Sequence, residues 1–133
     1  MTPATIKLTN VAPVLRVAQL DRSIAYYRDR LGFAIEFEHE GSYASVVRDG
    51  CRVHLKCSPP VERDAAAFEA AEHIDACFGV EGIELLASEV IAREASIAVS
   101  LRQMPYGKEL YVRDPDGYVL GFVEAQAERG MAE

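Results

Sequence analysis

The segment YVRDPDGYVLGFVE, residues 111–124, predicts a β-hairpin. Two runs of β-branched, aromatic and leucine residues, which favour strands, flank the turn DPDG at 114–117. Proline presets the first turn angle and glycine accepts a left-handed backbone, so the order suits a three-residue loop. In this register Tyr111 faces Gly121, and a glycine in mid-strand packs nothing against its neighbours. Gly121 therefore marks a position where a side chain is missing.

The elements that precede this hairpin occur twice along the chain. Each half has a strand, a helix and three further strands, beginning with VAPVLRV (11–17) and DACFGV (75–80). Neither half could bury its sheet alone, so we expect the two to pack as a pair. The prediction is an α+β fold of two βαβββ modules that form a curved, mainly antiparallel sheet with the helices on its convex side. One domain would hold module 1 (about 11–57), a linker (58–67) and module 2 (about 75–124).

The first predicted helix, LDRSIAYYRDRLG (20–32), has clear boundary signals. Asp21 can cap its start, Ile24, Tyr27 and Leu31 share one face, and Gly32 can end it. The second predicted helix spans EGIELLASEVIAREA (81–95). Both helices are therefore expected to lay one apolar face against their sheets.

Hairpin geometry also predicts which side chains share a face of the sheet. The Asp49-Gly50 turn places Ser45 opposite His54, so the neighbouring Val46 and Val53 point to the other, apolar face. In the 111–124 hairpin, Glu109, Tyr111 and Gly121 share the mixed face. Two such mixed faces would enclose a cup.

Composition narrows the class of protein. The 133 residues carry 21 acidic and 14 basic side chains, a net charge of −7 that disfavours nucleic acid and anionic membranes. Three cysteines without CxxC spacing predict no disulfide framework. The N-terminal stretch MTPATIKLTN lacks a signal-peptide pattern, and no apolar run is long enough to span a membrane. We expect a cytoplasmic protein.

The segments PVLRVAQLDRSIAYYRDRLGF (13–33) and LYVRDPDGYVLGFVE (110–124) resemble the vicinal oxygen chelate superfamily. The resemblance covers about residues 11–124. That group includes glyoxalase I, extradiol dioxygenases, fosfomycin-resistance enzymes and bleomycin-resistance proteins. In its metal-dependent members a divalent ion in the cup polarises vicinal oxygens of the substrate.

The resemblance places the family's four metal-ligand positions on Ala12, His54, Asp75 and Gly121. Alanine and glycine offer no donor atom, so two ligands are missing. Because a catalytic divalent site keeps at least three protein ligands, we expect neither a metal nor another cofactor. Gly121 is then the place of a lost glutamate.

Two functions remain open. The first is a metal-free protein of the bleomycin-resistance type that binds a small drug or aromatic metabolite, with His54, Tyr111, Tyr43, Arg16 and Glu109 as ligand contacts and no catalytic residue assigned. The second is a glyoxalase-class lyase or dioxygenase that uses Ni, Zn, Mn or Fe at an atypical site. In either case we expect a homodimer, because short sheets gain by covering their edge strands. Whether the protein is an enzyme stays undecided by the sequence.

Overall fold

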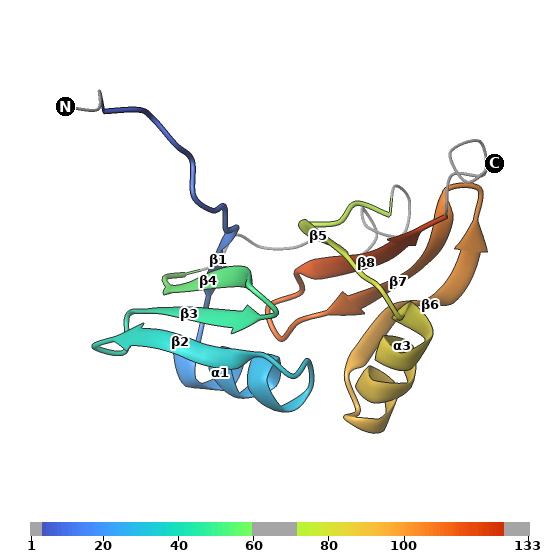
Figure 1. The fold of residues 1–133 in the computed structure, drawn as a ribbon. Helices are drawn as coiled ribbons and strands as arrows, with labels where there is room; N and C mark the ends of the chain where they lie inside the picture. Colours follow the sequence, from blue (N-terminus) through green and yellow to red (C-terminus); the bar gives the residue numbers. More distant parts are fainter. Residues whose placement is uncertain (1–3, 60–71, 127–133) are drawn as a thin grey trace.

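The computed structural model describes residues 4–59 and 72–126, and it confirms an α+β fold of two βαβββ modules (Figure 1). Module 1 contains β1 (Val14–Val17), α1 (Leu20–Asp29), β2 (Ala34–His39), β3 (Tyr43–Arg48) and β4 (Cys51–Cys57). Module 2 contains β5 (Ala76–Gly79), α3 (Ile83–Ala92), β6 (Ser96–Met104), β7 (Gly107–Arg113) and β8 (Val119–Ala125). Most of the predicted linker (58–67) and the end of the C-terminal tail lie outside the described residues.

The two modules have the same strand order. One sheet runs β1-β4-β3-β2 and the other β5-β8-β7-β6, with the first strand of each module parallel to its last and the remaining pairs antiparallel. The predicted registers are confirmed, because Ser45 pairs with His54 and Tyr111 with Gly121. Gly117 takes a left-handed φ of 88°, as the three-residue loop requires.

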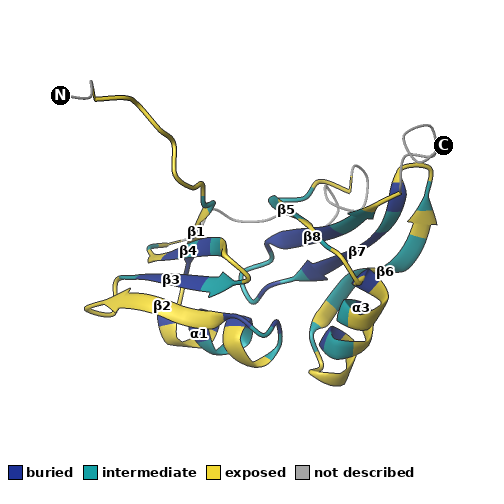
Figure 2. Ribbon diagram, viewed as in Figure 1, coloured by how far each residue is buried: buried dark blue, intermediate teal, exposed yellow. Residues whose placement is uncertain are grey.

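Each helix covers one face of its own sheet (Figure 1). Ile24, Tyr27 and Leu31 are at most 5% exposed, and they pack on the predicted apolar face, where Val46 and Val53 are fully buried. Figure 2 shows the buried residues concentrated in the central strands β3, β4, β7 and β8. Among the described residues no helix covers the opposite face of either sheet, and we call these two faces the open faces.

The predicted cap of the first helix is wrong. The helix begins at Leu20, so Gln19 is the N-cap and Asp21 lies in the first turn, where it makes no capping hydrogen bond. Carboxylates from module 2 bond at the starts of both helices. Asp116 Oδ1 accepts from the Ala18 amide, and Glu124 Oε1 accepts from the amides of Gly82 and Ile83. Negative charge near the N-terminus of a helix interacts favourably with the helix dipole and so stabilises the helix.

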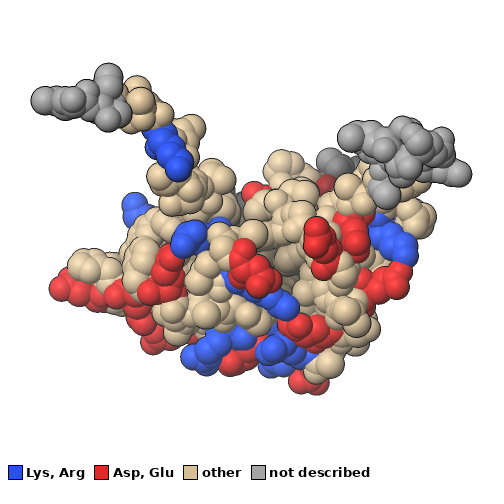
Figure 3. Space-filling model, viewed as in Figure 1, with Lys and Arg blue, Asp and Glu red and all other residues tan. Residues whose placement is uncertain are grey.

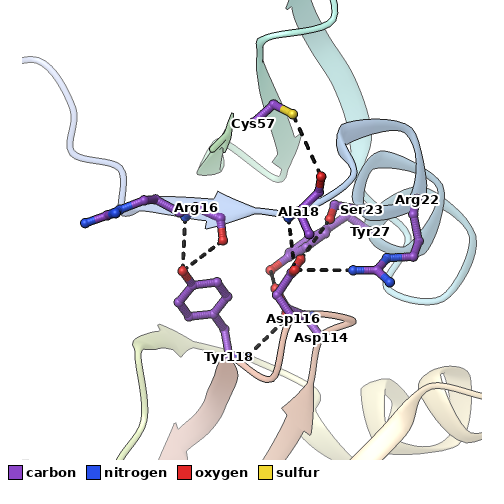
Figure 4. A network of polar contacts seen from close by, with 9 residues as sticks. All are labelled: Arg16, Ala18, Arg22, Ser23, Tyr27, Cys57, Asp114, Asp116 and Tyr118. Atoms are coloured by element: carbon purple, nitrogen blue, oxygen red, sulfur yellow. Dashed lines mark hydrogen bonds and ion pairs between the residues drawn. The ribbon is translucent and has the colours of Figure 1, made fainter. Parts of the chain in front are cut away.

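The DPDG loop joins the two modules (Figure 4). The hydroxyl of Tyr118 donates to the Arg16 carbonyl at 2.9 Å, so module 2 is tied to β1. Asp116 bonds Arg22 and Ser23 of α1. The second module is therefore attached to both β1 and α1 of the first.

Candidate functional site on the open faces

The open face of module 1 carries a cluster of aromatic rings from three strands. Phe37 of β2 lies parallel to Tyr43 of β3, with centroids 6.3 Å apart, and edge-on to His54 of β4 at 5.8 Å. Tyr43 and His54 meet at 80° with centroids 5.4 Å apart. Phe37 remains 45% exposed. These three residues form what we call the aromatic platform.

A register shift in β2 creates this platform. Ile35 pairs with Val46 and Phe37 pairs with Ser45, so two steps along β2 match only one along β3. Such a bulge turns adjacent side chains toward one face. Glu36 accordingly bonds Ser45 Oγ at 2.8 Å, while Phe37 reaches the rings of Tyr43 and His54.

One hydrogen bond orients the histidine of the platform. The Tyr43 hydroxyl and His54 Nδ1 are 2.8 Å apart, and which of them donates depends on the histidine tautomer. If the hydroxyl donates, the proton of the neutral ring sits on Nε2. His54 is half-buried, so Nε2 can then offer one directed hydrogen bond beside the rings.

A carboxylate and a guanidinium border the platform. Glu36 forms a salt bridge with Arg52 at 2.8 Å, and the hydrogen bond from Arg52 lowers the pKa of the Glu36 carboxyl. Lys56 is exposed at the other end of β4. The open face of module 1 therefore has an apolar centre and charged margins.

The open face of module 2 contains a buried carboxylate. Glu109 is 1% exposed and accepts hydrogen bonds from Tyr106, from Tyr111 at 3.2 Å and from Arg102 at 2.8 Å. Burial acts to raise the pKa of Glu109, but the bonds from Tyr106 and Arg102 outweigh it and hold that pKa below its usual value. The bond to Glu109 raises the pKa of Tyr106 to about 12. Glu109 is therefore an ionised, fully paired group.

Neighbouring side chains fill the space beside Gly121. A methyl group built on Gly121 would lie 2.8 Å from Ile74 Cδ1 and 3.3 Å from Tyr111 Cε1. The Tyr111 ring is 8% exposed and lies under the Arg102 guanidinium, whose carbon is 5.6 Å from the ring centroid. The missing side chain at 121 has thus been replaced by tyrosine and isoleucine packing.

The donor set does not fit a divalent metal at the family's positions. Ala12 and Gly121 provide no donor, and Asp75 Oδ2 already accepts a hydrogen bond of 2.9 Å from the Val119 amide. Within residues 4–59 and 72–126, no three His, Cys, Asp or Glu side chains lie close enough to share an ion. His54 would remain as a single ligand, fewer than a divalent site requires.

The predicted contact residues are divided between the two modules. Tyr43 and His54 belong to module 1, whereas Tyr111 and Glu109 belong to module 2. The side chain of Arg16 is exposed and points away from the junction (Figure 4). Two hollows, of about 520 and 990 Å³, are lined by none of these five residues. Each module therefore carries part of the predicted set, and we call these two parts half-sites.

Sequence reasoning missed two residues of these half-sites. In strict alternation Phe37 would share a face with Ile35, so only knowledge of the bulge places it on the platform. Arg102 lies in β6 beyond a second register shift, between Val99 and Arg102, which hides its pairing with Glu109. The one available signal was the opposite charge of these two residues.

The arrangement of the modules defines the class of protein, and the comparisons with known proteins agree with it. The model of the Glyoxalase/Bleomycin resistance protein/Dioxygenase superfamily matches residues 7–122. The chain therefore belongs to this superfamily. No curated protein sequence matches the chain.

Solved structures share the whole fold. A bleomycin-binding protein from bleomycin-producing Streptomyces verticillus, complexed with copper(II)-bleomycin, has 24% identity and a TM-score of 0.70 over 92% of this chain and 100% of its own. TnmS3, an antibiotic binding protein from Streptomyces sp. CB03234, has 14% identity and a TM-score of 0.71 over the same shares. A glyoxalase/bleomycin resistance protein/dioxygenase from Alicyclobacillus acidocaldarius has 13% identity and a TM-score of 0.75, covering 91% of this chain and 94% of its own.

Proposed function

We propose that the protein binds a small, flat organic molecule, a drug or an aromatic metabolite, without the help of a metal. The aromatic platform carries this proposal. An exposed ring such as Phe37 costs free energy in water, and it stacks well on a flat ligand. His54 supplies one directed hydrogen bond next to the stack, which suits a site that combines apolar area with few polar contacts.

A second copy of the chain could bring the half-site of one module against that of the other. We propose a homodimer in which the platform of one protomer faces the Glu109 and Tyr111 surface of its partner. An extended segment before β1 supports this assembly, since it leaves the body of the protein (Figure 1). Its side chains Ile6, Leu8 and Val11 are 98%, 92% and 87% exposed. Burying these apolar side chains against a second chain would remove their surface from water, which is favourable.

The three exposed free cysteines suit a reducing compartment, and we propose the cytoplasm. Among the residues that the structure describes, there is no helix with the length and apolar character needed to cross a membrane.

Titration calorimetry tests the proposed function. Bleomycin and, separately, planar aromatic antibiotics are titrated into the native chain and into Phe37→Ala. Removing the stacked ring should weaken binding by about 1 to 3 kcal/mol. Ile91→Ala is the matched control, because Ile91 is a 64% exposed apolar residue on the far helix α3. Equal loss in both variants would argue against the platform.

Metal analysis tests the alternative lyase or dioxygenase. The chain is purified without chelators and its content of Ni, Zn, Mn and Fe is measured. We expect well under one ion per chain, because the donor positions 12 and 121 are empty of ligand atoms. One tightly held ion per chain would replace the binding proposal with an enzymatic one.

A further inference from the structure

A groove separates the two modules on the helix side of the molecule, away from the open faces. Its volume is about 520 Å³, which lies in the range of small-molecule sites. Module 1 contributes the segment that follows α1 and the β3–β4 turn, and module 2 contributes the end of β5, one side of α3 and Phe122 of β8. Figure 3 shows the surface hollowed between the modules.

The floor of the groove is aromatic. Phe78 and Phe122 are stacked, with centroids 5.1 Å apart and planes at 16°, and Phe33 meets Phe78 edge-on at 6.1 Å. Phe33 and Phe122 are buried, whereas Phe78 keeps part of its surface in the groove. Leu85 adds a side chain that is 79% exposed at the margin. The floor therefore offers apolar area to a flat ligand.

The charged residues of the groove are mainly acidic. Asp49, Glu81 and Glu89 line it, against the single cation Arg48. Arg48 is already held by Glu89, with two hydrogen bonds of 2.7 and 2.9 Å. Glu81 is exposed and has no ion-pair partner within the described residues. Arg48 also lies 3.9 Å from Asp49, so a positive group would gain most beside Glu81, where no described side chain supplies a charge partner.

We propose that this groove is a second ligand site, and that it takes a small molecule with a flat apolar body and one cationic group. The body would lie on the Phe78 ring and the cation beside Glu81 and Asp49. A cation next to aromatic faces gains further attraction from the ring quadrupoles. This site is independent of the platform, because the groove is lined by none of the platform residues Phe37, Tyr43 and His54.

The three free cysteines provide the test within the native chain. Cys51 lines the groove, whereas Cys57 and Cys77 do not, and all three are exposed. Alkylation of each thiol by iodoacetamide is followed by mass spectrometry, with and without millimolar benzamidinium. If benzamidinium occupies most of the grooves, alkylation of Cys51 should become about threefold slower or more. The alkylation rates of Cys57 and Cys77 should not change. Neutral benzamide, which has the same shape, should protect less.

Two variants sharpen the result. Glu81→Lys should weaken protection of Cys51 about fivefold or more, because an attractive charge becomes repulsive. Glu38→Lys makes the same change of charge on strand β2, outside the groove, and should leave protection unchanged. Added salt should reduce protection in the native chain.

Four outcomes would overturn the proposal. Equal slowing of all three thiols indicates general reagent loss, and selective slowing of Cys77 places the probe on the open face. Equal protection by benzamide removes the case for a cation. If Cys51 becomes better protected as the protein concentration rises, with no benzamidinium present, a second copy of the chain covers the groove.

Discussion

The Tyr27 hydroxyl in α1 donates a hydrogen bond of 2.9 Å to Asp114 Oδ2 at the end of β7, although the two residues are 87 positions apart. Tyr27 is fully buried and Asp114 is 4% exposed. The other oxygen, Oδ1, accepts from the amides of Asp116 and Tyr118. One carboxylate therefore holds the DPDG loop together and attaches it to the helix of the other module.

Removing the Tyr27 hydroxyl should loosen this attachment. Tyr27→Phe keeps the buried ring but leaves Asp114 Oδ2 without its donor, so the free energy of unfolding should fall by about 1 to 3 kcal/mol. Urea unfolding followed by circular dichroism measures the change. Tyr43→Phe is the control: its hydroxyl is on an open face where water can replace it, and a loss as large as that of Tyr27→Phe would contradict this account.

The same carboxylate predicts how stability depends on pH. Burial raises the pKa of Asp114 from 3.8 to about 6, so between these values the folded protein binds a proton that the unfolded chain has released. Stability from this group is present below pH 4 and is lost as pH rises through about 6, by at most about 3 kcal/mol. Unfolding free energies measured from pH 4.5 to 7.5 should therefore decline with pH.

Carboxylates that are paired with arginines elsewhere make the stability rise with pH, but they do so in a lower pH range. The pKa values of Glu36 and Glu89 are lowered, mainly by hydrogen bonds from arginines, so their contributions are lost only as pH falls below about 4.5. Asp114→Asn removes the titration and should flatten the decline between pH 5 and 7. A slope that persists in this variant would assign it to another group.

The proposed dimer predicts a mass of twice 14.6 kDa in sedimentation at micromolar concentration. Ile6→Ser with Leu8→Ser should weaken the dimer about 100-fold or more, since two large apolar side chains would no longer be buried between chains. Thr5→Ser with Thr9→Ser changes neighbouring polar positions and should leave the mass unchanged. A native chain that sediments as a monomer would contradict the dimer and, with it, the shared cup.

The fold could be predicted from the sequence because its signals are local. The turns Asp49-Gly50 and DPDG fix hairpin registers, and those registers determine which alternate residues reach the core. The capping of the first helix could not be predicted in this way, since the carboxylate bonded at its start is Asp116 from the other module. Contacts between distant segments leave no spacing signal.

The candidate site was predictable only in part for the same reason. His54 and Tyr43 follow from the hairpin register, but Phe37 joins them through a bulge that breaks alternation. Nothing in the sequence indicates that Ile74, which precedes β5, would occupy the space beside Gly121. Packing of this kind depends on the shape of the folded chain.

Rebuilding the family's metal site tests whether Gly121 is the place of a lost ligand. Ala12→His with Gly121→Glu would restore two donors beside His54 and Asp75. The structure adds a requirement, because the new Cβ at 121 would lie 2.8 Å from Ile74 Cδ1, so Ile74→Ala must accompany the change. The triple variant should take up about one Ni or Zn per chain after dialysis, as four protein ligands allow. Metal content is measured by mass spectrometry, with Ile74→Ala alone as the control. If the triple variant binds no more metal than this control, the alignment of positions 12, 54, 75 and 121 with the family's ligands is wrong.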